Sequence, residues 1–181
     1  MIIEKLLPQG VESRVHDLMT AIQFPWYWHA ENIGSESPSE NIPQLTHMFY
    51  QDKKGSSIQW NSSVSLIVSH FAQKTNINVK KIIRVEGNLI SNLAHKKESL
   101  DNLIHLDMER DQPGNYISFV YYVMDSDGDT IIYEDDKKTI VESSPPRQGN
   151  CIWFNSKTWH RSSVPINHNR RIVINIILET F

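Results

Sequence analysis

The sequence predicts a mostly β fold with flanking helices, a double-sheet jelly roll, and two observations lead to this prediction. From about residue 81 onward, apolar and polar residues alternate in short segments, which is the period of a β-strand. Turn sequences separate these segments, among them SDGD, SSPPRQG and PINHN. Helical periodicity occurs only before residue 80. Short antiparallel strands with helices confined to one part of the chain are typical of two packed sheets braced by helices.

The N-terminal part is expected to hold two helices and a long connection. In the first helix, VESRVHDLMTAI, apolar residues recur at helical spacing: Val11, Val15, Leu18, Met19 and Ile22. Residues 24–43 begin with the aromatic run FPWYWH and continue with Ser, Pro, Asn and Gly, so an irregular loop is expected, with Phe24 to His29 as a candidate lid. A second helix, SSVSLIVSHFAQKT, is expected behind a Ser cap, with this buried face: Val64, Ile67, Val68 and Phe71.

Eight strands are expected after residue 80, at about 81–91, 102–108, 115–124, 130–134, 138–143, 150–155, 159–164 and 170–179. A chain of 181 residues can bury a single core. We therefore expect one domain over residues 1–181, with a helical and loop part at about 1–80 and a β core at about 81–181.

The composition bounds the functions that this chain could have. Its formal net charge is −3 and its pI is about 6.2, whereas a dedicated nucleic-acid binder has a basic excess. The only cysteine, Cys151, can form no internal disulfide, which favours a reducing compartment. No run of about 18 apolar residues occurs, and no apolar block follows a basic start. We expect a soluble, cytoplasmic protein without a membrane or nucleic-acid partner.

One combination of residues points to chemistry. His105 and Asp107 stand two positions apart in an expected strand and so point to the same face, and His160 follows 53 residues later at the end of NCIWFNSKTWH. Two imidazoles and one carboxylate that converge can hold a divalent metal with neighbouring positions open, as in non-haem Fe(II) oxygenases. The same ligands also suit a catalytic zinc, so they do not choose the reaction by themselves.

Arg171 opens the last expected strand, RIVINIIL, 11 residues after His160. A buried guanidinium offers two parallel N–H donors to a carboxylate. A dianionic co-substrate could therefore bind the metal at one end and Arg171 at the other. In an alternating strand, Arg170 would point to the opposite face, and the apolar residues do not decide between the two arginines.

The segments around these residues resemble a known family, the Fe(II)/2-oxoglutarate-dependent oxygenases, and within it the small prolyl-4-hydroxylase-like group that includes many phage proteins. The resemblance covers roughly residues 45–181 and rests on the order of five segments: IIRVEGNLI, IHLD, SFVYYVMDSDGDTIIYED, PPRQGNCIWFNSKTWHRSS and RRIVINIIL. It implies a double-stranded β-helix, the cupin-like form of the jelly roll. It also implies that His105, Asp107 and His160 form the catalytic iron site.

The resemblance favours Arg171 over Arg170 as the residue that binds the distal carboxylate of 2-oxoglutarate, because members carry this Arg beside an Ile-Val-Ile-Asn run. Asn88 and Tyr121 are further candidates to hydrogen-bond the co-substrate. The alternatives are a polar cluster at the rim of the core for Asn88 and simple packing for Tyr121. Many relatives use an Arg-x-Ser pair here, but Val173 stands at the Ser position, so the second hydrogen bond to the co-substrate is unassigned and Ser162 is an outside candidate.

The expected function is hydroxylation by Fe(II), 2-oxoglutarate and O₂ of an unknown substrate, with a peptidyl side chain such as proline ahead of a small molecule. Two alternatives remain open. A zinc or other metal hydrolase on the same fold would not need Arg171, and in a non-catalytic binding jelly roll the two His and the Asp would be accidental.

Overall fold

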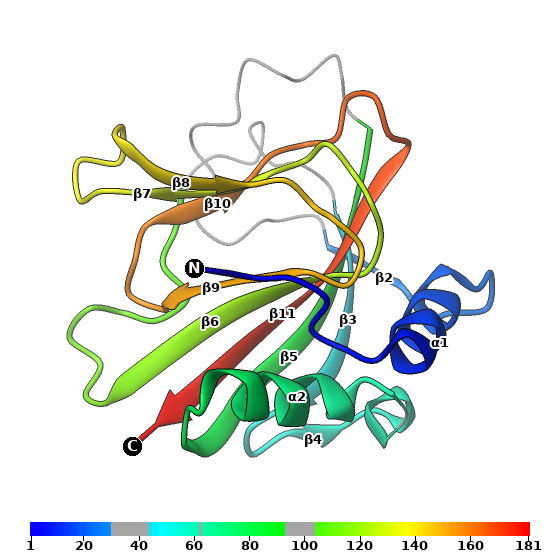
Figure 1. Ribbon diagram of the computed structural model, residues 1–181, viewed down its shortest axis with the longest axis horizontal. Coiled ribbons are helices and arrows are strands. Elements are labelled where there is room, and N and C mark those ends of the chain that lie inside the picture. The colour runs from blue at the N-terminus through cyan, green and yellow to red at the C-terminus, as the bar shows by residue number, and fades with distance from the viewer. Residues whose placement is uncertain (30–43, 62, 93–103) are drawn as a thin grey trace.

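The computed structural model describes residues 1–29, 44–61, 63–92 and 104–181, and its strands form two antiparallel sheets (Figure 1). The larger sheet has the order β1 (Ile2–Ile3), β9 (Cys151–Asn155), β6 (Asn115–Tyr122), β11 (Arg170–Thr180), β5 (Val79–Ser91), β3 (Gln44–Gln51) and β2 (Tyr27–His29), with β4 (Gly55–Ser56) paired to β3. The smaller sheet has the order β10 (His160–Ser162), β7 (Thr130–Tyr133) and β8 (Ile140–Ser144). This is the mostly β, double-sheet arrangement that the alternating sequence predicts.

Two helices, α1 (Gln9–Thr20) and α2 (Ser65–Thr75), cover the face of the larger sheet that is turned away from the smaller sheet (Figure 1). A short 3₁₀ turn, η2 (Ile58–Asn61), precedes α2. The helices and the sheet share one large apolar core, in which the rings of Phe71 on α2 and Phe119 on β6 stack with their centroids 4.1 Å apart. The core therefore fixes the larger sheet from its outer side.

The other face of the larger sheet looks toward the smaller sheet and carries both apolar and polar residues. A small apolar cluster joins the two sheets and consists of Val120, Tyr122, Ile132, Ile152, Phe154 and Val173. Along β11, residues 172, 174, 176 and 178 belong to the helix-side core, while Val173 belongs to this inner cluster. The central strand is thus buried on both faces, which explains its nearly continuous apolar run.

The N-terminal part contains the two expected helices, but it also contributes four strands to the larger sheet: β1, β2, β3 and β4. The expected irregular loop at 24–43 was wrong for Tyr27–His29, which pair with β3 as a short edge strand, and residues 30–43 lie outside the described residues. Phe24 is buried in the core and Trp26 packs against it. Tertiary pairing here outweighs the local turn signals.

Helix boundaries also differ in detail. The N-cap of α2 is Val64 and no side chain caps it, so the expected Ser cap was wrong. The hydroxyl of Ser63 instead accepts a hydrogen bond from Arg14 Nε at 3.2 Å. The expected buried face of α2 is confirmed for Val64, Ile67, Val68 and Phe71, whereas Ile22 lies beyond the end of α1 and is fully exposed. Neither α1 nor α2 has the length and apolar character that crossing a bilayer requires.

The expected strand at 102–108 is replaced by irregular structure in its described part, residues 104–108. This segment is held to β10 by one isolated bridge, in which His105 N donates to His160 O at 2.9 Å and His160 N donates to His105 O at 3.1 Å. Asp107 N in turn donates to Ser156 O at 3.1 Å. A few backbone hydrogen bonds to distant segments of the chain thus fix residues 105 and 107, although these residues are not part of a continuous β-ladder.

Candidate metal centre

His105, Asp107 and His160 lie together between the two sheets, and the potential ligand atoms of the three side chains lie within 4.8 Å of one another. Two of them come from the irregular segment 104–108 and the third begins β10. The His105 and His160 rings are neighbours, with centroids 4.4 Å apart and ring planes tilted by 53°. In the described part of the chain, this is the group of metal-ligating side chains that converge on one point.

The ring of His160 is oriented by the backbone. Its Nδ1 lies 2.9 Å from Thr158 O and therefore donates, which leaves Nε2 as the nitrogen that faces Asp107 Oδ2, at 3.6 Å. Burial lowers the pKa of His160 to about 4, so the imidazole is neutral at physiological pH. A neutral ring with one nitrogen fixed by a carbonyl is the form in which histidine binds metals.

The carboxylate of Asp107 is buried and receives hydrogen bonds from three side chains. Arg84 Nη2 donates at 3.2 Å, Ser118 Oγ at 2.6 Å and Asn175 Nδ2 at 3.3 Å. Burial alone would raise the pKa of Asp107, but its surroundings, among them the Arg84 guanidinium and the Ser118 hydrogen bond, outweigh burial and lower the pKa. Among these, the Arg84 guanidinium carries a permanent charge. Asp107 is therefore an anionic oxygen donor beside two imidazoles, a donor set that fits Fe(II), Zn(II) and related divalent ions.

The guanidinium of Arg171 lies in the same interior space. It is 3% exposed, and its Nε donates to Gly128 O at 2.6 Å while Nη2 donates to Thr130 Oγ1 at 2.9 Å. In the described part of the chain, no carboxylate forms an ion pair with it. Gly128 needs to be small here, since a Cβ would lie 2.6 Å from Ser163 O and 2.9 Å from Arg171 Cδ. A buried cation that only neutral groups contact is suited to an anionic ligand.

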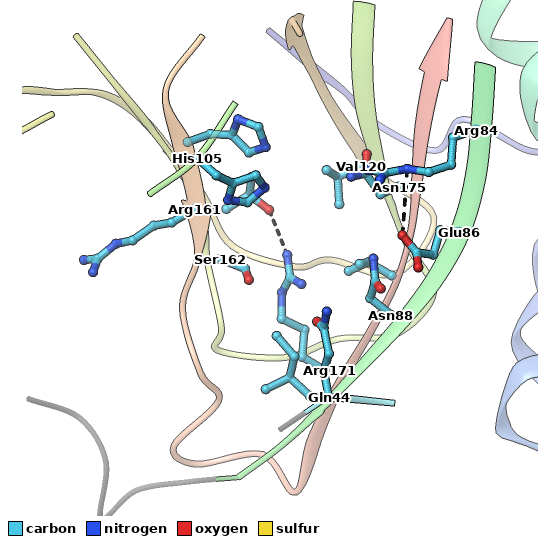
Figure 2. A pocket seen from close by; sticks show the side chains of 14 residues that line it. Gln44, Arg84, Glu86, Asn88, His105, Val120, Arg161, Ser162, Arg171 and Asn175 are labelled. Atoms are coloured by element: carbon cyan, nitrogen blue, oxygen red, sulfur yellow. Dashed lines mark hydrogen bonds and ion pairs between the residues drawn. The ribbon is translucent and has the colours of Figure 1, made fainter. Parts of the chain in front are cut away.

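A pocket of about 100 Å³ connects these groups, which is room for a small molecule rather than for one water. Figure 2 shows His105, Arg161 and Ser162 on one side and Arg84, Glu86, Asn88 and Asn175 on the other, with Arg171 between them. Arg84, Glu86 and Asn88 alternate along β5, and Arg171, Val173 and Asn175 alternate along β11. Arg170, on the opposite face of β11, is not among the lining residues.

Asn88 and Tyr121, the two further candidates to hydrogen-bond the co-substrate, lie in different places. Asn88 lines the pocket, and its Oδ1 is buried without a hydrogen-bond partner in the described structure. Tyr121 does not line the pocket, and this placement contradicts its expected role toward a co-substrate. Its side chain lies in the helix-side core with Phe119 and Val123, because odd-numbered residues of β6 point away from the smaller sheet. Burial raises the pKa of Tyr121, as expected for a phenol in an apolar core.

Several residues of the site escape sequence reasoning. Ser118 and Thr130 are single polar residues inside apolar strands, and this is the one local signal that they give. Ser162, by contrast, was an outside candidate from the sequence, and it lines the pocket. In the described part of the chain, the aromatic segment Phe24–His29 contributes no residue to the pocket wall, and Tyr27 lies instead over a separate shallow depression beside His47.

No family model and no curated protein matches this sequence. Solved structures do match the fold. An oxidoreductase of the 2OG-Fe(II) oxygenase family from Burkholderia pseudomallei matches with a TM-score of 0.70 and 11% identity, over 99% of this chain and 84% of that chain. A prolyl hydroxylase from Trichoplax adhaerens, solved with a peptide fragment of hypoxia inducible factor, matches with a TM-score of 0.64 and 15% identity, over 99% and 82% of the two chains.

HygX from Streptomyces hygroscopicus, solved with nickel, 2-oxoglutarate and hygromycin B bound, matches with a TM-score of 0.61 and 9% identity, over 99% of this chain and 82% of that chain. The fold of this chain is therefore the jelly roll of the 2-oxoglutarate- and Fe(II)-dependent oxygenases. At these identities the likeness concerns the fold, and the chemistry has to be argued from the site.

Proposed function

We propose that this protein is an Fe(II)- and 2-oxoglutarate-dependent dioxygenase that hydroxylates its substrate. The observation that carries the proposal is the buried Arg171, which shares a pocket with His105 and His160, the two histidines that converge with Asp107. Thr130, which binds Arg171, and Ile132, which pairs with His160, are two residues apart on β7. This spacing corresponds to roughly 7 Å along a strand. A short dicarboxylate can span such a distance between a metal and a guanidinium.

In this proposal, His105, Asp107 and His160 hold the iron, and Arg171 binds the distal carboxylate of 2-oxoglutarate. Iron and 2-oxoglutarate, when bound, supply the oxidation of a substrate C–H bond by O₂, with succinate and CO₂ as the co-products. Gly128 and Thr130 orient the guanidinium, and Asn88 is placed to donate its amide N–H to the co-substrate.

A metal hydrolase is the second candidate, because the three ligands also suit zinc. It would not need a buried arginine in the same pocket, and Arg171 therefore favours the oxygenase. A non-catalytic binding domain explains neither the fixed tautomer of His160 nor the three donors on Asp107.

For the substrate, a peptide side chain such as proline is our first candidate, because one of the similar structures is a prolyl hydroxylase with a bound peptide. A small-molecule substrate is the alternative, because another similar structure, HygX, has hygromycin B bound. The chain's net charge of −3 speaks against nucleic acid as a substrate. The single, buried Cys151 fits a reducing compartment such as the cytoplasm.

The first test measures metal and co-substrate together. Titration with Fe(II) under nitrogen should give one site per chain, and the loaded protein should bind 2-oxoglutarate. With O₂ present, it should release succinate. His160→Ala should lose stoichiometric Fe(II) binding while keeping its fold, because it removes the nitrogen that faces Asp107. Unchanged iron affinity in His160→Ala would contradict the assignment of the ligands, and a loaded wild-type protein that ignores 2-oxoglutarate would favour the hydrolase.

A further inference from the structure

The two oxygens of the Asp107 carboxylate have different surroundings. Oδ1 accepts hydrogen bonds from Arg84 Nη2 at 3.2 Å and from Asn175 Nδ2 at 3.3 Å. Oδ2 accepts hydrogen bonds from Ser118 Oγ at 2.6 Å and from Asn175 Nδ2 at 3.5 Å, and it lies 3.6 Å from His160 Nε2. Each carboxylate oxygen offers about two lone-pair directions. Oδ1 therefore carries the charged donor, Arg84, whereas Oδ2 carries only neutral donors and lies beside His160.

Arg84 forms ion pairs with two carboxylates. It projects from β5 into the interior, its side chain is 18% exposed, and its Nε lies 3.8 Å from a carboxylate oxygen of Glu86. The guanidinium thus lies between two carboxylates, Asp107 and Glu86, and it is hydrogen-bonded to Oδ1 of Asp107, whereas His160 lies beside Oδ2. Figure 2 shows Arg84, Glu86 and Asn175 on the wall opposite His105.

A permanent positive charge this close to a metal site works against the binding of a cation. Arg84 therefore does not lie here to strengthen metal binding, and its position beside Asp107 calls for another explanation. Both oxygens of a carboxylate can bind one metal ion, and doing so would occupy a position that a bound co-substrate needs. An arginine on Oδ1 prevents this second contact.

We propose that Arg84, assisted by Asn175, restricts Asp107 to metal binding through Oδ2 alone and so keeps a coordination position open for 2-oxoglutarate. Arg84 is a positioning residue in this account, because it acts through Asp107. The inference rests on the proposed function, since it concerns the metal and the co-substrate of the same pocket.

The test compares Arg84→Met, which removes the charge and the donor at similar length, with Arg84→Lys, which keeps both. Calorimetry under nitrogen gives the dissociation constant for Co(II), and then for 2-oxoglutarate on the Co(II)-loaded protein. In Arg84→Met, Co(II) should bind as tightly as in the wild type or more tightly. The 2-oxoglutarate dissociation constant should rise by about tenfold or more, which corresponds to about 1.4 kcal/mol. Arg84→Lys should restore most of the affinity, and Arg170→Met is the matched control that should change neither constant.

The visible absorption of bound Co(II), which depends on coordination number, supplies a readout that needs no co-substrate. The Arg84→Met spectrum should differ from wild type before 2-oxoglutarate is added, and Arg84→Lys should resemble wild type. Weaker Co(II) binding in Arg84→Met would overturn the proposal, because Arg84 would then simply hold Asp107 in place. An unchanged spectrum with an unchanged 2-oxoglutarate constant would overturn it as well.

Two controls separate this inference from its premise. If wild-type protein binds Co(II) but not 2-oxoglutarate, the proposed function fails, and the Co(II) spectra still decide the role of Arg84. Thermal unfolding of the metal-free variants checks their fold, and Arg84→Ala, for which the same results are expected, replaces Arg84→Met if the latter does not fold.

Discussion

Arg170 and Arg171 are neighbours in the sequence but lie on opposite faces of β11, and only Arg171 lines the pocket. The pairing of Arg171 with Ile90 and of Val173 with Asn88 places both members of each pair on the inner face of the sheet. A shift of the register by one residue would exchange the two arginines. At the scale of single residues, the function of this site therefore depends on one strand register.

We expect Arg171→Ala to weaken 2-oxoglutarate binding strongly, because the substitution leaves the distal carboxylate without its buried partner. Truncating one member of such a pair costs about 2 to 5 kcal/mol, or roughly 30-fold to several thousand-fold in affinity. Arg170→Ala should lose far less than tenfold. Calorimetry with Fe(II) under nitrogen measures both constants, and iron binding should survive in each variant. Equal losses in the two variants would contradict the assignment.

At the scale of elements, one side chain joins the two loops that surround Arg171. Asp127, in the loop between β6 and β7, accepts hydrogen bonds from the backbone N–H groups of Ile166, Asn167 and His168, in the loop between β10 and β11. Burial would raise the pKa of Asp127, but these hydrogen bonds outweigh it and lower the pKa to about 2. Gly128, the next residue, accepts the hydrogen bond of Arg171.

A carboxylate whose pKa is lower in the folded state than its unfolded value of about 3.9 stabilises the fold above that value. The contribution is lost as pH falls through about 2. We expect Asp127→Asn to be less stable than wild type at pH 7 by roughly 1 to 3 kcal/mol. The difference should shrink between pH 4 and 2, in urea unfolding followed by circular dichroism. A difference that is constant over this pH range would show that the Asp127 charge does not stabilise the loops.

At the scale of the whole molecule, the binding pocket and the apolar core occupy opposite faces of the same sheet. The helix-side core immobilises β5, β6 and β11 from outside, and these strands carry Arg84, Ser118, Asn175 and Arg171 on their inner faces. Most of the rigidity needed by the site therefore comes from side chains that never contact it. The inner face can hold charged groups because the outer face supplies the apolar burial.

Ligands that bind the folded state should stabilise this whole unit. At 100 times its dissociation constant, 2-oxoglutarate should add about 2.7 kcal/mol to the metal-loaded protein. This corresponds to a rise in Tm of roughly 5 to 10 °C for a chain of this size. Arg171→Ala should keep the stabilisation by metal and lose the further rise at the same co-substrate concentration. Differential scanning calorimetry under nitrogen checks this result, and Arg170→Ala should behave like the wild type.

The sequence by itself determined the class of fold and the identity of the three converging residues. Period-two alternation and turn chemistry are local properties, so seven of the eight strands expected after residue 80 correspond to strands of the structure. His105, Asp107 and His160 stood out because few residue types bind metals. The sequence did not predict the N-terminus of α2 or the strand β3, since these depend on packing against elements that are distant in the sequence.

Tertiary structure alone decided what surrounds these residues. The donors on Asp107 come from 23, 11 and 68 positions away in the sequence, and no local pattern places Arg84, Ser118 and Asn175 around one carboxylate. Tyr121 shows the same limit, because the face on which it lies follows from the pairing of β6 with β11 and from the packing of the helices. Periodicity reports that a strand alternates, whereas the choice of inner face depends on which side the rest of the chain covers.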